Sequence, residues 1–386
     1  MTRAVPVLAS AAALAASCAP VGAQSRPQRT ALHDYRVVTV AAGLEVPWSI
    51  AFLPDGDILV TERAGRLRVI RDGELVPDPV PGIPAVVARG QGGLMDVVPH
   101  PAFASNRTIY LSYSKPVPEL GRTGTTAVIR GTFENDRFTF LDEVFEAVSR
   151  GNGHYGCRLA FDADGYLYLS VGDRQVPPRG DLAAHPAQDL SDHHGVIVRL
   201  HDDGGVPEDN PFVGREGARP EIWSYGHRNP QGLAVHPETG AVWLTEHGPR
   251  GGDEVNVSTP GGNYGWPVIG YGVNYRGGTA IHASTHAEGM EQPLHYWVPS
   301  IGVSGLTFYT GDKFPKWRGN LFAGGLTGRR IDRLTIEDGR VVASETVFSG
   351  MGRVRDVREG PDGYIYVALE ARGGGKTPIV RLEPAG

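Results

Sequence analysis

Short alternating apolar segments follow turns rich in Asp, Pro and Gly at six places along the chain. In one of the clearest, Leu53-Pro54-Asp55-Gly56 leads into Ile58-Leu59-Val60. A turn of this composition followed by residues of strand period predicts a turn and then a β-strand. The six copies fall at residues 53–60, 100–111, 162–169, 236–244, 318–323 and 360–367. With 53 Gly and 30 Pro spread through 386 residues, the composition also favours an all-β chain.

The spacing of the six copies predicts a six-bladed β-propeller. One four-stranded blade needs about 40–50 residues, so six blades with inserted loops account for about 350 residues, and closing the ring removes exposed sheet edges. The widest gap, between residues 165 and 237, indicates long insertions, and we expect such loops on the active-site face around the central channel. An irregular seven-bladed ring or a pair of β-sandwiches would also accommodate the spacing. The pattern indicates no domain boundary.

The N-terminal residues have the order of a secretory signal. Met1-Thr2-Arg3 precedes an apolar run that ends in small residues at Val21-Gly22-Ala23. We therefore expect a signal peptide at residues 1–23 and a periplasmic or secreted protein. An alternative is a bacterial lipoprotein signal at residues 14–18, which would leave Cys18 lipidated.

The remaining chain divides into an expected N-terminal extension at residues 24–40 and a propeller domain at residues 41–386. After cleavage at Ala23, Cys157 would be the one cysteine left, which excludes an intramolecular disulfide. No later segment is long and apolar enough for a transmembrane helix. The net charge of −6, with no block of Lys or Arg, gives no reason to expect nucleic acid as a partner.

Four parts of the chain place glycine and polar residues where a strand core would not have them. They are residues 90–96, 152–159, 225–232 with 246–254, and 353–356. Taken singly, each has a structural explanation. His154 between glycines suits a turn bonded to backbone, Arg228 before Asn229-Pro230 suits a turn cap, and Arg353 and Arg355 suit pairing with neighbouring acids.

Taken together, these residues indicate dehydrogenase chemistry. Arg353 and Arg355 point the same way on a strand and, with Arg228, suit a ligand with several carboxylates, because guanidinium groups bind carboxylates in bidentate fashion. The turn at Gly248-Pro249 offers backbone carbonyls, which suit calcium if an anionic cofactor completes its shell. His154 could then take a proton from a substrate hydroxyl, while the metal and Arg228 stabilise negative charge on an acceptor oxygen.

The same segments resemble one known family, the soluble glucose/sorbosone dehydrogenases that use pyrroloquinoline quinone (PQQ), and within it the bacterial aldose sugar dehydrogenases. The resemblance runs from about residue 43 to the C-terminus. Its most specific motifs are Tyr225-Gly226-His227-Arg228-Asn229-Pro230-Gln231-Gly232-Leu233, Glu246-His247-Gly248-Pro249, Asp253-Glu254-Val255-Asn256 and Gly261-Gly262-Asn263-Tyr264-Gly265-Trp266-Pro267.

By this resemblance the protein oxidises aldoses at the anomeric carbon to lactones, with PQQ and calcium as cofactors. The resemblance implies that His154 is the general base, with Gln91 nearby and Arg228 beside the quinone oxygens. Gln91 lies in a matching Gly-Gln-Gly-Gly-Leu sequence. A small sugar is the implied substrate, and a soluble or membrane carrier the implied electron acceptor.

The resemblance also assigns the remaining cofactor and metal contacts. Asn229 and Gln231 correspond to cofactor contacts, and Arg353 and Arg355 to the residues that hold the cofactor carboxylates. The carbonyls of Gly248 and Pro249 correspond to the calcium ligands of the active site. Glu254 and the backbone of Tyr264 resemble a second, structural calcium site.

Two departures from the family pattern bear on these assignments. The family often has an Asp directly before the base, where this chain has Gly153, so the group that orients His154 is unassigned. Many members also have a cofactor-binding Lys where this chain has Thr327, and Arg329 and Arg330 are the candidates to replace it. If neither reaches the channel, cofactor binding is weakened or lost.

Two other classes of protein remain open. One is a calcium-dependent propeller lactonase or esterase, which would hold its metal with side-chain carboxylates and amides. The other is a propeller that only binds a partner through its loops and needs no converging histidine, glutamine and arginines. The substrate pocket is expected in variable loops at residues 174–192 or 271–292.

Overall fold

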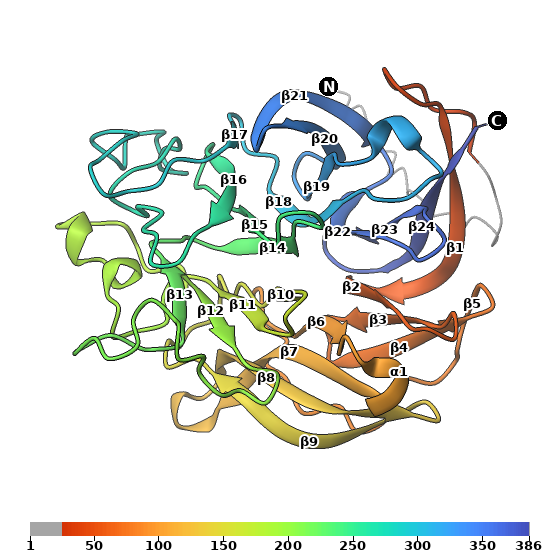
Figure 1. Ribbon diagram of the computed structural model, residues 1–386, viewed down its shortest axis with the longest axis horizontal. Coiled ribbons are helices and arrows are strands. Elements are labelled where there is room, and N and C mark those ends of the chain that lie inside the picture. Colours follow the sequence, from red (N-terminus) through yellow and green to blue (C-terminus); the bar gives the residue numbers. More distant parts are fainter. Residues whose placement is uncertain (1–24, 386) are drawn as a thin grey trace, which may run out of the picture.

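The computed structural model describes residues 25–385, which form a ring of six four-stranded antiparallel sheets around a central axis (Figure 1). This confirms the predicted all-β, six-bladed propeller. The expected signal peptide at residues 1–23, with Cys18, lies outside the described residues. No helix among residues 25–385 is long and apolar enough to cross a membrane.

Blades 1 to 3 follow one another along the chain. Blade 1 contains β2 (Pro47–Phe52), β3 (Ile58–Glu62), β4 (Arg66–Arg71) and β5 (Glu74–Leu75). Blade 2 contains β6 (Leu94–Pro99), β7 (Thr108–Val117), β8 (Thr123–Glu134) and β9 (Arg137–Glu146), with the short helix α1 (Phe103–Asn106) between its first two strands. Blade 3 contains β10 (Leu159–Phe161), β11 (Leu167–Val171), β12 (Val196–Leu200) and β13 (Ile222–Tyr225).

Blades 4 and 5 continue the same pattern, and blade 6 closes the ring. Blade 4 contains β14 (Pro230–Val235), β15 (Val242–Glu246), β16 (Asp253–Ser258) and β17 (His295–Trp297). Blade 5 contains β18 (Val303–Phe308), β19 (Leu321–Gly325), β20 (Arg330–Glu337) and β21 (Arg340–Ser349). Blade 6 contains β22 (Arg353–Glu359), β23 (Ile365–Glu370), β24 (Lys376–Pro384) and, from the other end of the chain, β1 (Tyr35–Glu45). Single 3₁₀ turns lie in the loops at Pro118–Leu120, Leu182–Ala184, Pro186–Gln188 and Pro315–Trp317.

The two ends of the chain are joined in blade 6. Strand β1 pairs antiparallel with β24, with Val37 opposite Leu382, and it forms the outer edge of that sheet. The segment expected as an extension, residues 24–40, thus supplies the start of this strand. The pairing satisfies backbone groups that an open ring would expose, so it holds the ring closed without a disulfide.

The first strand of each blade lies at the axis, and the core lies between the blades. The inner strands β2, β6, β10, β14, β18 and β22 contact one another in sequence around the ring. One large cluster of buried side chains joins blades 5 and 6 and includes Tyr35, Trp317 and Phe322. Fully burying one such large apolar side chain contributes about 1.5–3 kcal/mol, so these contacts between blades are a main source of stability.

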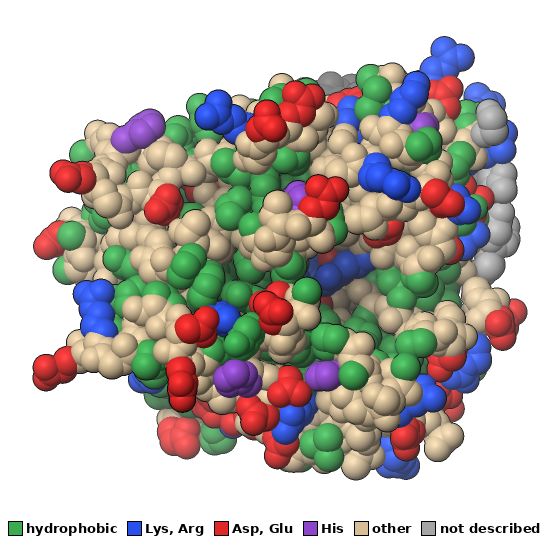
Figure 2. Space-filling view, viewed as in Figure 1, with side chains coloured by type: hydrophobic (Ala, Val, Ile, Leu, Met, Phe, Trp, Pro, Cys, Tyr) green, Lys and Arg blue, Asp and Glu red, His purple; other side chains and the backbone are tan. Residues whose placement is uncertain are grey.

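The repeated turns and the polar segments lie at opposite ends of the strands. Gly56 and Gly363 of the repeated turns have φ values of +95° and +77°, which favour glycine. The polar segments are at the other end, because residues 90–96, 152–159, 225–232 and 353–356 lie at the starts of inner strands, and residues 246–254 join β15 to β16 at that same end. The face toward the viewer in Figure 2 is the one with the repeated turns, and it is hollowed near the centre of the ring, where basic side chains are visible.

Candidate functional site

A cavity of about 420 Å³ lies where the polar segments meet at the ring axis. Its walls come from several blades. The lining includes seven residues that the sequence had indicated: Gln91, Asn229, Gln231, Gly248, Pro249, Arg353 and Arg355. His154 and Arg228 are not part of the lining, but each is bonded to a residue that is. The Nη1 of Arg228 donates to the Gly248 carbonyl at 2.7 Å, and the backbone N–H of His154 donates to Gln91 Oε1 at 2.7 Å.

His154 is held in an unusual backbone conformation beside this cavity. Its φ of 44° lies in the left-handed region, which is uncommon for a residue other than glycine. The bond from its N–H to Gln91 and a bond from Arg174 Nη1 to its carbonyl, at 2.9 Å, maintain this conformation. Its side chain is almost completely buried, at 6% exposure. The local backbone therefore fixes the direction in which the imidazole points.

The group that orients the His154 ring is Asp173. Its Oδ1 lies 2.5 Å from His154 Nδ1, and its Oδ2 accepts a hydrogen bond from Trp266 Nε1 at 2.7 Å. Sequence reasoning did not identify Asp173, because it lies in another part of the chain, after β11. A carboxylate that directly follows a buried strand, in Val171-Gly172-Asp173, was the available signal. The chain has Gly153 and no acid directly before His154, and Asp173, just after β11, provides the carboxylate instead.

The electrostatics of the pair favour a neutral histidine beside an ionised carboxylate. Burial lowers the pKa of His154, the positive charges of Arg228 and Arg174 lower it further, and Asp173 partly opposes them. Burial alone would raise the pKa of Asp173, but His154 and Arg228 hold it below its ordinary value. A neutral imidazole bonded through Nδ1 has its Nε2 available as a proton acceptor. Among residues 25–385, His154 Nε2 has no hydrogen-bond partner.

Arg228 is fixed between two blades behind the Gly248 carbonyl. Its Nη1 donates to the carbonyls of His247 and Gly248 at 3.0 and 2.7 Å, and its guanidinium lies 5.2 Å from the Trp266 ring centre. Its backbone N–H donates to Glu246 at 2.8 Å. The Nε of Arg228 is buried, and the described part of the chain offers it no acceptor. The Nη2 of Arg228 is not among the buried atoms and has no hydrogen bond to a described residue, so it is the donor left for a ligand.

The amides Asn229 and Gln231 connect the base segment to the arginines. Asn229 Oδ1 accepts from the Gly156 N–H at 3.1 Å, and Gln231 Nε2 donates to the Gly156 carbonyl at 3.3 Å. Gln231 Oε1 accepts from Arg355 Nη1 at 3.0 Å. Both amides line the cavity, so they tie blades 3, 4 and 6 together at its wall.

The arginines form a positively charged wall. Arg355 Nη2 and Arg353 Nε lie 2.6 and 3.2 Å from the carboxylate of Glu370. Arg63, directly after β3, lines the same cavity and was not identified from the sequence. It has no ion pair or side-chain hydrogen bond to any described residue, and burial, with Arg355 and Arg353, lowers its pKa although Glu370 opposes this. Three guanidinium groups thus face one carboxylate.

The two arginines that the sequence offered as replacements for a lysine at Thr327 do not line this cavity. Arg330 is paired with Asp332, at 2.8 Å from Nη2 to Oδ2. Arg329 is exposed and lines a neighbouring groove instead. Arg63 and the exposed Arg250 are therefore the additional cations at the cavity wall.

The turn that carries Gly248 and Pro249 is held by Asp253. Its Oδ1 accepts from the Gly248 N–H at 3.0 Å, and its Oδ2 accepts from the N–H groups of Gly302 and Val303 at 2.6 and 3.0 Å. The Pro249 carbonyl accepts from Ser300 Oγ at 3.2 Å. A side chain at Gly248 would clash, because a Cβ there would lie 2.2 Å from the Gly252 carbonyl oxygen. Both carbonyls that the sequence indicated as metal ligands are at the cavity.

Glu254 lies outside the cavity, opposite Glu246 in the pairing of β16 with β15. Asn256 Nδ2 donates to both carboxylates, at 3.0 and 3.1 Å. Burial and the charge of Glu246 raise the pKa of Glu254 to about 8. Tyr264 lines the same small cleft as Glu254 and stacks on His227 at 4.3 Å. Among residues 25–385, no group of three His, Cys, Asp or Glu side chains is arranged to hold a metal.

A second cluster of charges lies within the ring and is balanced. Arg158 Nη1 lies 3.1 Å from Asp356 and 3.5 Å from Asp96, and Arg358 lies 3.0 and 3.2 Å from the same two residues. Both carboxylates are fully buried and also accept backbone N–H groups, those of Ile50 and Leu159. The charges of two arginines and two aspartates cancel here, so the cluster has no excess charge to attract a ligand. Its ion pairs join residues of different blades.

Comparisons with known proteins agree with this architecture. The model of the family described as Glucose / Sorbosone dehydrogenase matches residues 44–381. The aldose sugar dehydrogenase YliI of Escherichia coli is 45% identical over 339 residues, which cover 86% of this chain and 89% of that protein.

Two solved structures are also similar. The soluble aldose sugar dehydrogenase of Escherichia coli in its apo-form gives a TM-score of 0.83 at 40% identity, with 91% of this chain and 99% of that chain covered. The PQQ-bound aldose sugar dehydrogenase of Streptomyces coelicolor gives 0.72 at 28% identity, with 95% and 99% covered.

Proposed function

The chain belongs to the glucose/sorbosone dehydrogenase family, and from this premise we propose that it oxidises aldose sugars at the anomeric carbon to lactones, using PQQ and calcium. The observation that carries the proposal is the His154–Asp173 pair, in which Nδ1 is held at 2.5 Å and Nε2 is left without a protein partner beside the cavity. A base of this kind is what removal of a proton from a sugar hydroxyl requires.

The cavity wall suits a cofactor with several carboxylates. PQQ is a tricarboxylate, and Arg63, Arg353 and Arg355 together exceed the charge of Glu370 by two. Guanidinium groups bind carboxylates in bidentate fashion, so these three side chains would hold the acidic edge of the cofactor. Asn229, Gln231 and the free Nη2 of Arg228 offer hydrogen bonds to its remaining oxygens. A hydrolase would instead need free carboxylates at the cavity, and both that line it, Asp253 and Glu370, are bonded to protein.

Calcium would be held by the carbonyls of Gly248 and Pro249 together with cofactor oxygens. Calcium prefers hard oxygen ligands, and two neutral carbonyls next to a bound carboxylate meet this preference. A second calcium would be held by Glu254 and the backbone of Tyr264. The raised pKa of Glu254 fits this role, because a cation would stabilise the ionised carboxylate that burial and Glu246 disfavour.

The residues of the chain then have distinct roles in the reaction. His154 accepts the proton of the anomeric hydroxyl at Nε2, and Asp173 stabilises the imidazolium that results. Gln91 fixes the backbone of the base, and Arg228 places positive charge where an acceptor oxygen becomes negative. When bound, PQQ supplies the hydride acceptor. The arginine wall orients the ligand, and removal of the proton by a positioned base contributes about 10²–10⁴-fold to such a step.

The proposal also covers the substrate, the electron acceptor and the location of the protein. The substrate is a small sugar, and an electron carrier reoxidises the protein. The order of residues 1–23 favours export to the periplasm or beyond, with Cys18 as the alternative lipid anchor. The loops at residues 174–192 and 271–292 are the proposed determinants of sugar choice.

The test is aldose-dependent reduction of an artificial dye by the purified apoprotein, with and without added PQQ and calcium, beside His154→Gln. We expect activity that requires both additions and is lost in the variant, while the absorbance change on mixing with PQQ is retained, since His154 is not at the arginine wall. No dye reduction together with no absorbance change on mixing would contradict the proposal.

A further inference from the structure

A groove of about 660 Å³ adjoins the cavity on the side of blades 1, 5 and 6. The two spaces share five residues: Arg63, Leu326, Thr327, Arg353 and Glu370. The groove also has walls of its own, made by Arg329 after β19 and by residues 371–374 after β23. The side chains of these five shared residues would therefore separate a molecule bound in the groove from one bound in the cavity.

The groove is basic and its charge is not balanced. Its lining contains four arginines, Arg63, Arg329, Arg353 and Arg372, and one acid, Glu370. Glu370 is already paired with Arg353 and Arg355. Within residues 25–385, Arg63, Arg329 and Arg372 have no ion pair within 4 Å and no side-chain hydrogen bond. Since Arg63 and Arg353 are assigned to the cofactor carboxylates, Arg329 and Arg372 provide the charge that remains for a partner.

This local charge opposes that of the whole chain. The protein has a net charge of −6, whereas the lining of the groove contains four arginines and one acid. Arg329 and Arg372 are exposed, and their long side chains reach solvent at the groove mouth. A region of this kind raises the local concentration of anionic partners and their rate of association.

We propose that this groove is the docking site of an acidic redox protein that takes electrons from the cavity. The inference rests on the proposed function, since it requires electrons to be present there. A protein is favoured over a small anion because Arg329 and Arg372 are exposed at the groove, where they can meet carboxylates on a partner's surface. Transient redox complexes bury little area and use charge to set their encounter rate.

The electrons balance as follows in each turnover. Oxidation of an aldose to its lactone breaks one C–H and one O–H bond and releases two electrons and two protons. A one-electron partner such as plastocyanin, an acidic copper protein, goes from Cu(II) to Cu(I). Two plastocyanin molecules are therefore reduced for each sugar oxidised, and the two protons pass to solvent.

The experiment compares two acceptor proteins of opposite charge on the enzyme loaded with PQQ and calcium. Sugar-dependent reduction of plastocyanin and of cytochrome c, a basic haem protein, is measured at low and high ionic strength. The double variant Arg329→Glu with Arg372→Glu reverses the charge of the groove without altering a residue that lines the cavity. Reduction of an uncharged benzoquinone reports whether the sugar reaction itself is intact.

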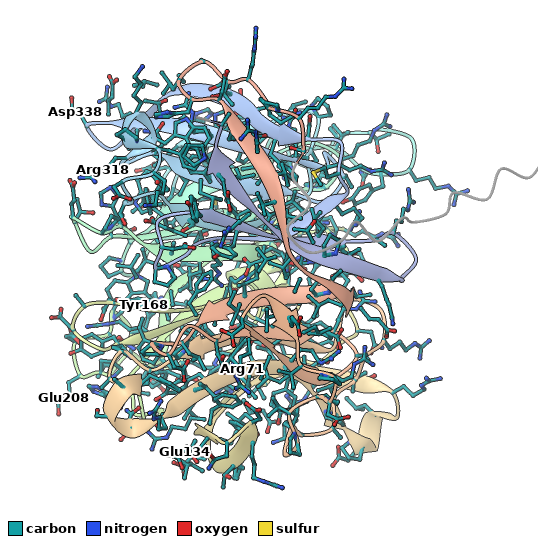
Figure 3. The ribbon with its side chains drawn as sticks, turned by 90° about the vertical axis from the view of Figure 1, so that its right-hand side faces the viewer. Arg71, Glu134, Tyr168, Glu208, Arg318 and Asp338 are labelled. Carbon is teal, nitrogen blue, oxygen red and sulfur yellow. The ribbon has the colours of Figure 1, made fainter. Side chains whose placement is uncertain are left out.

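A matched control makes the same change of charge on the opposite side of the molecule. Arg137 and Arg340 are exposed and begin β9 and β21, next to turns whose residues Glu134 and Asp338 lie on one side in Figure 3. The eight residues of β20 separate Arg340 from Arg329, a distance of about 26 Å along a strand. Arg137→Glu with Arg340→Glu therefore changes the net charge equally but leaves the groove intact.

We expect the groove variant to lower kcat/KM for plastocyanin about tenfold at low ionic strength, with the difference shrinking as salt is added. Benzoquinone reduction should stay unchanged, cytochrome c reduction should stay the same or rise, and the control variant should behave as the wild type. Equal plastocyanin rates in the groove and control variants would overturn the inference. So would a wild type that reduces benzoquinone but not plastocyanin. Loss of benzoquinone reduction in the wild type would instead overturn the proposed function.

Discussion

Two buried histidine–carboxylate pairs in this protein have the same chemistry but different surroundings. In one, His154 Nδ1 lies 2.5 Å from Asp173, and in the other His227 Nδ1 lies 2.9 Å from Glu246. The difference is at the second nitrogen. His227 Nε2 is bonded to Ser224 Oγ at 2.9 Å, and its ring stacks on Tyr264. His154 Nε2 has no partner among the described residues, and the backbone N–H of His154 is bonded to Gln91 in the cavity wall.

The comparison shows that a histidine–carboxylate pair does not by itself indicate a catalytic base. His227 is completely buried and both of its nitrogens are used, so it can hold blades together but cannot exchange a proton with a substrate. His154 keeps 6% of its surface and one free nitrogen. The same substitution at the two sites should therefore have opposite effects on activity and on stability.

The largest expected effect is on the activity of His154→Gln. Glutamine can donate to Asp173 but cannot accept a proton at neutral pH, so we expect kcat to fall about 10³-fold or more. The thermal midpoint should stay close to that of the wild type, because Asp173 keeps its bonds to Trp266 and to the Gln175 N–H. Steady-state kinetics with saturating sugar and a thermal melt check both points. Retained activity would show that another group is the base.

At the second site we expect the reverse. In His227→Gln one amide has to replace two ring nitrogens and a stacking contact, which leaves Glu246 or Ser224 poorly bonded in the core. The free energy of unfolding should fall by about 2–3 kcal/mol. Urea denaturation measures this loss, and kcat at 25 °C should remain within a few-fold of the wild type. A variant that is fully stable but inactive would assign His227 a role in the chemistry.

A smaller effect on rate is expected for Asp173→Asn. The amide keeps the size of the side chain but does not stabilise an imidazolium, and it can hold the ring in the wrong tautomer. We expect kcat to fall about 10²-fold, with KM for sugar nearly unchanged. The matched variant Asp202→Asn changes an acid beside His100 that does not line the cavity and should leave kcat unaltered. If both variants lose activity equally, the effect is one of folding.

The smallest effect is a change in pH dependence. His154 acts as a base when it is neutral, and burial lowers its pKa from the ordinary value of 6.5. The rise of kcat/KM with pH should therefore have its midpoint below pH 6.5. Asp173 raises this pKa, so its removal should lower it further. The acid limb of Asp173→Asn should therefore lie at lower pH than that of the wild type, even though its rates are lower. A limb displaced to higher pH would contradict the assignment of His154 as the titrating group.

The architecture could be predicted because its signals are local. Each turn of Asp, Pro and Gly specifies a reversal of the chain, and the alternating residues after it specify a strand. Gly56 and Gly363 have the left-handed φ values that such turns require. Six such copies in 386 residues predict six blades, because one blade needs about 40–50 residues. The polar segments before the inner strands could be found for the same reason, since they break the strand pattern.

The partners of the site residues could not be predicted, because they come from other strands or from other blades. Asp173 is 19 residues from His154 and reaches it through the pairing of β10 with β11. Arg63 belongs to blade 1 but lies at the same wall as Arg353 of blade 6. The expectation that Arg329 or Arg330 would reach the channel rested on their nearness to Thr327 in the chain, and the geometry favoured Arg63 instead. The cofactors and the signal peptide stay predictions.

The sequence by itself determined the class of fold, the number of blades and which segments carry chemistry, because period, turn composition and motif are properties of neighbouring residues. Only the tertiary structure decided which histidine has a free nitrogen and which arginines lack a counter-charge. Both properties depend on what closure of the ring brings within about 3 Å of a side chain, the range in which a hydrogen bond forms. His154 and His227 are alike in sequence as residues next to glycine-rich turns, and their different surroundings distinguish the proposed base from a structural residue.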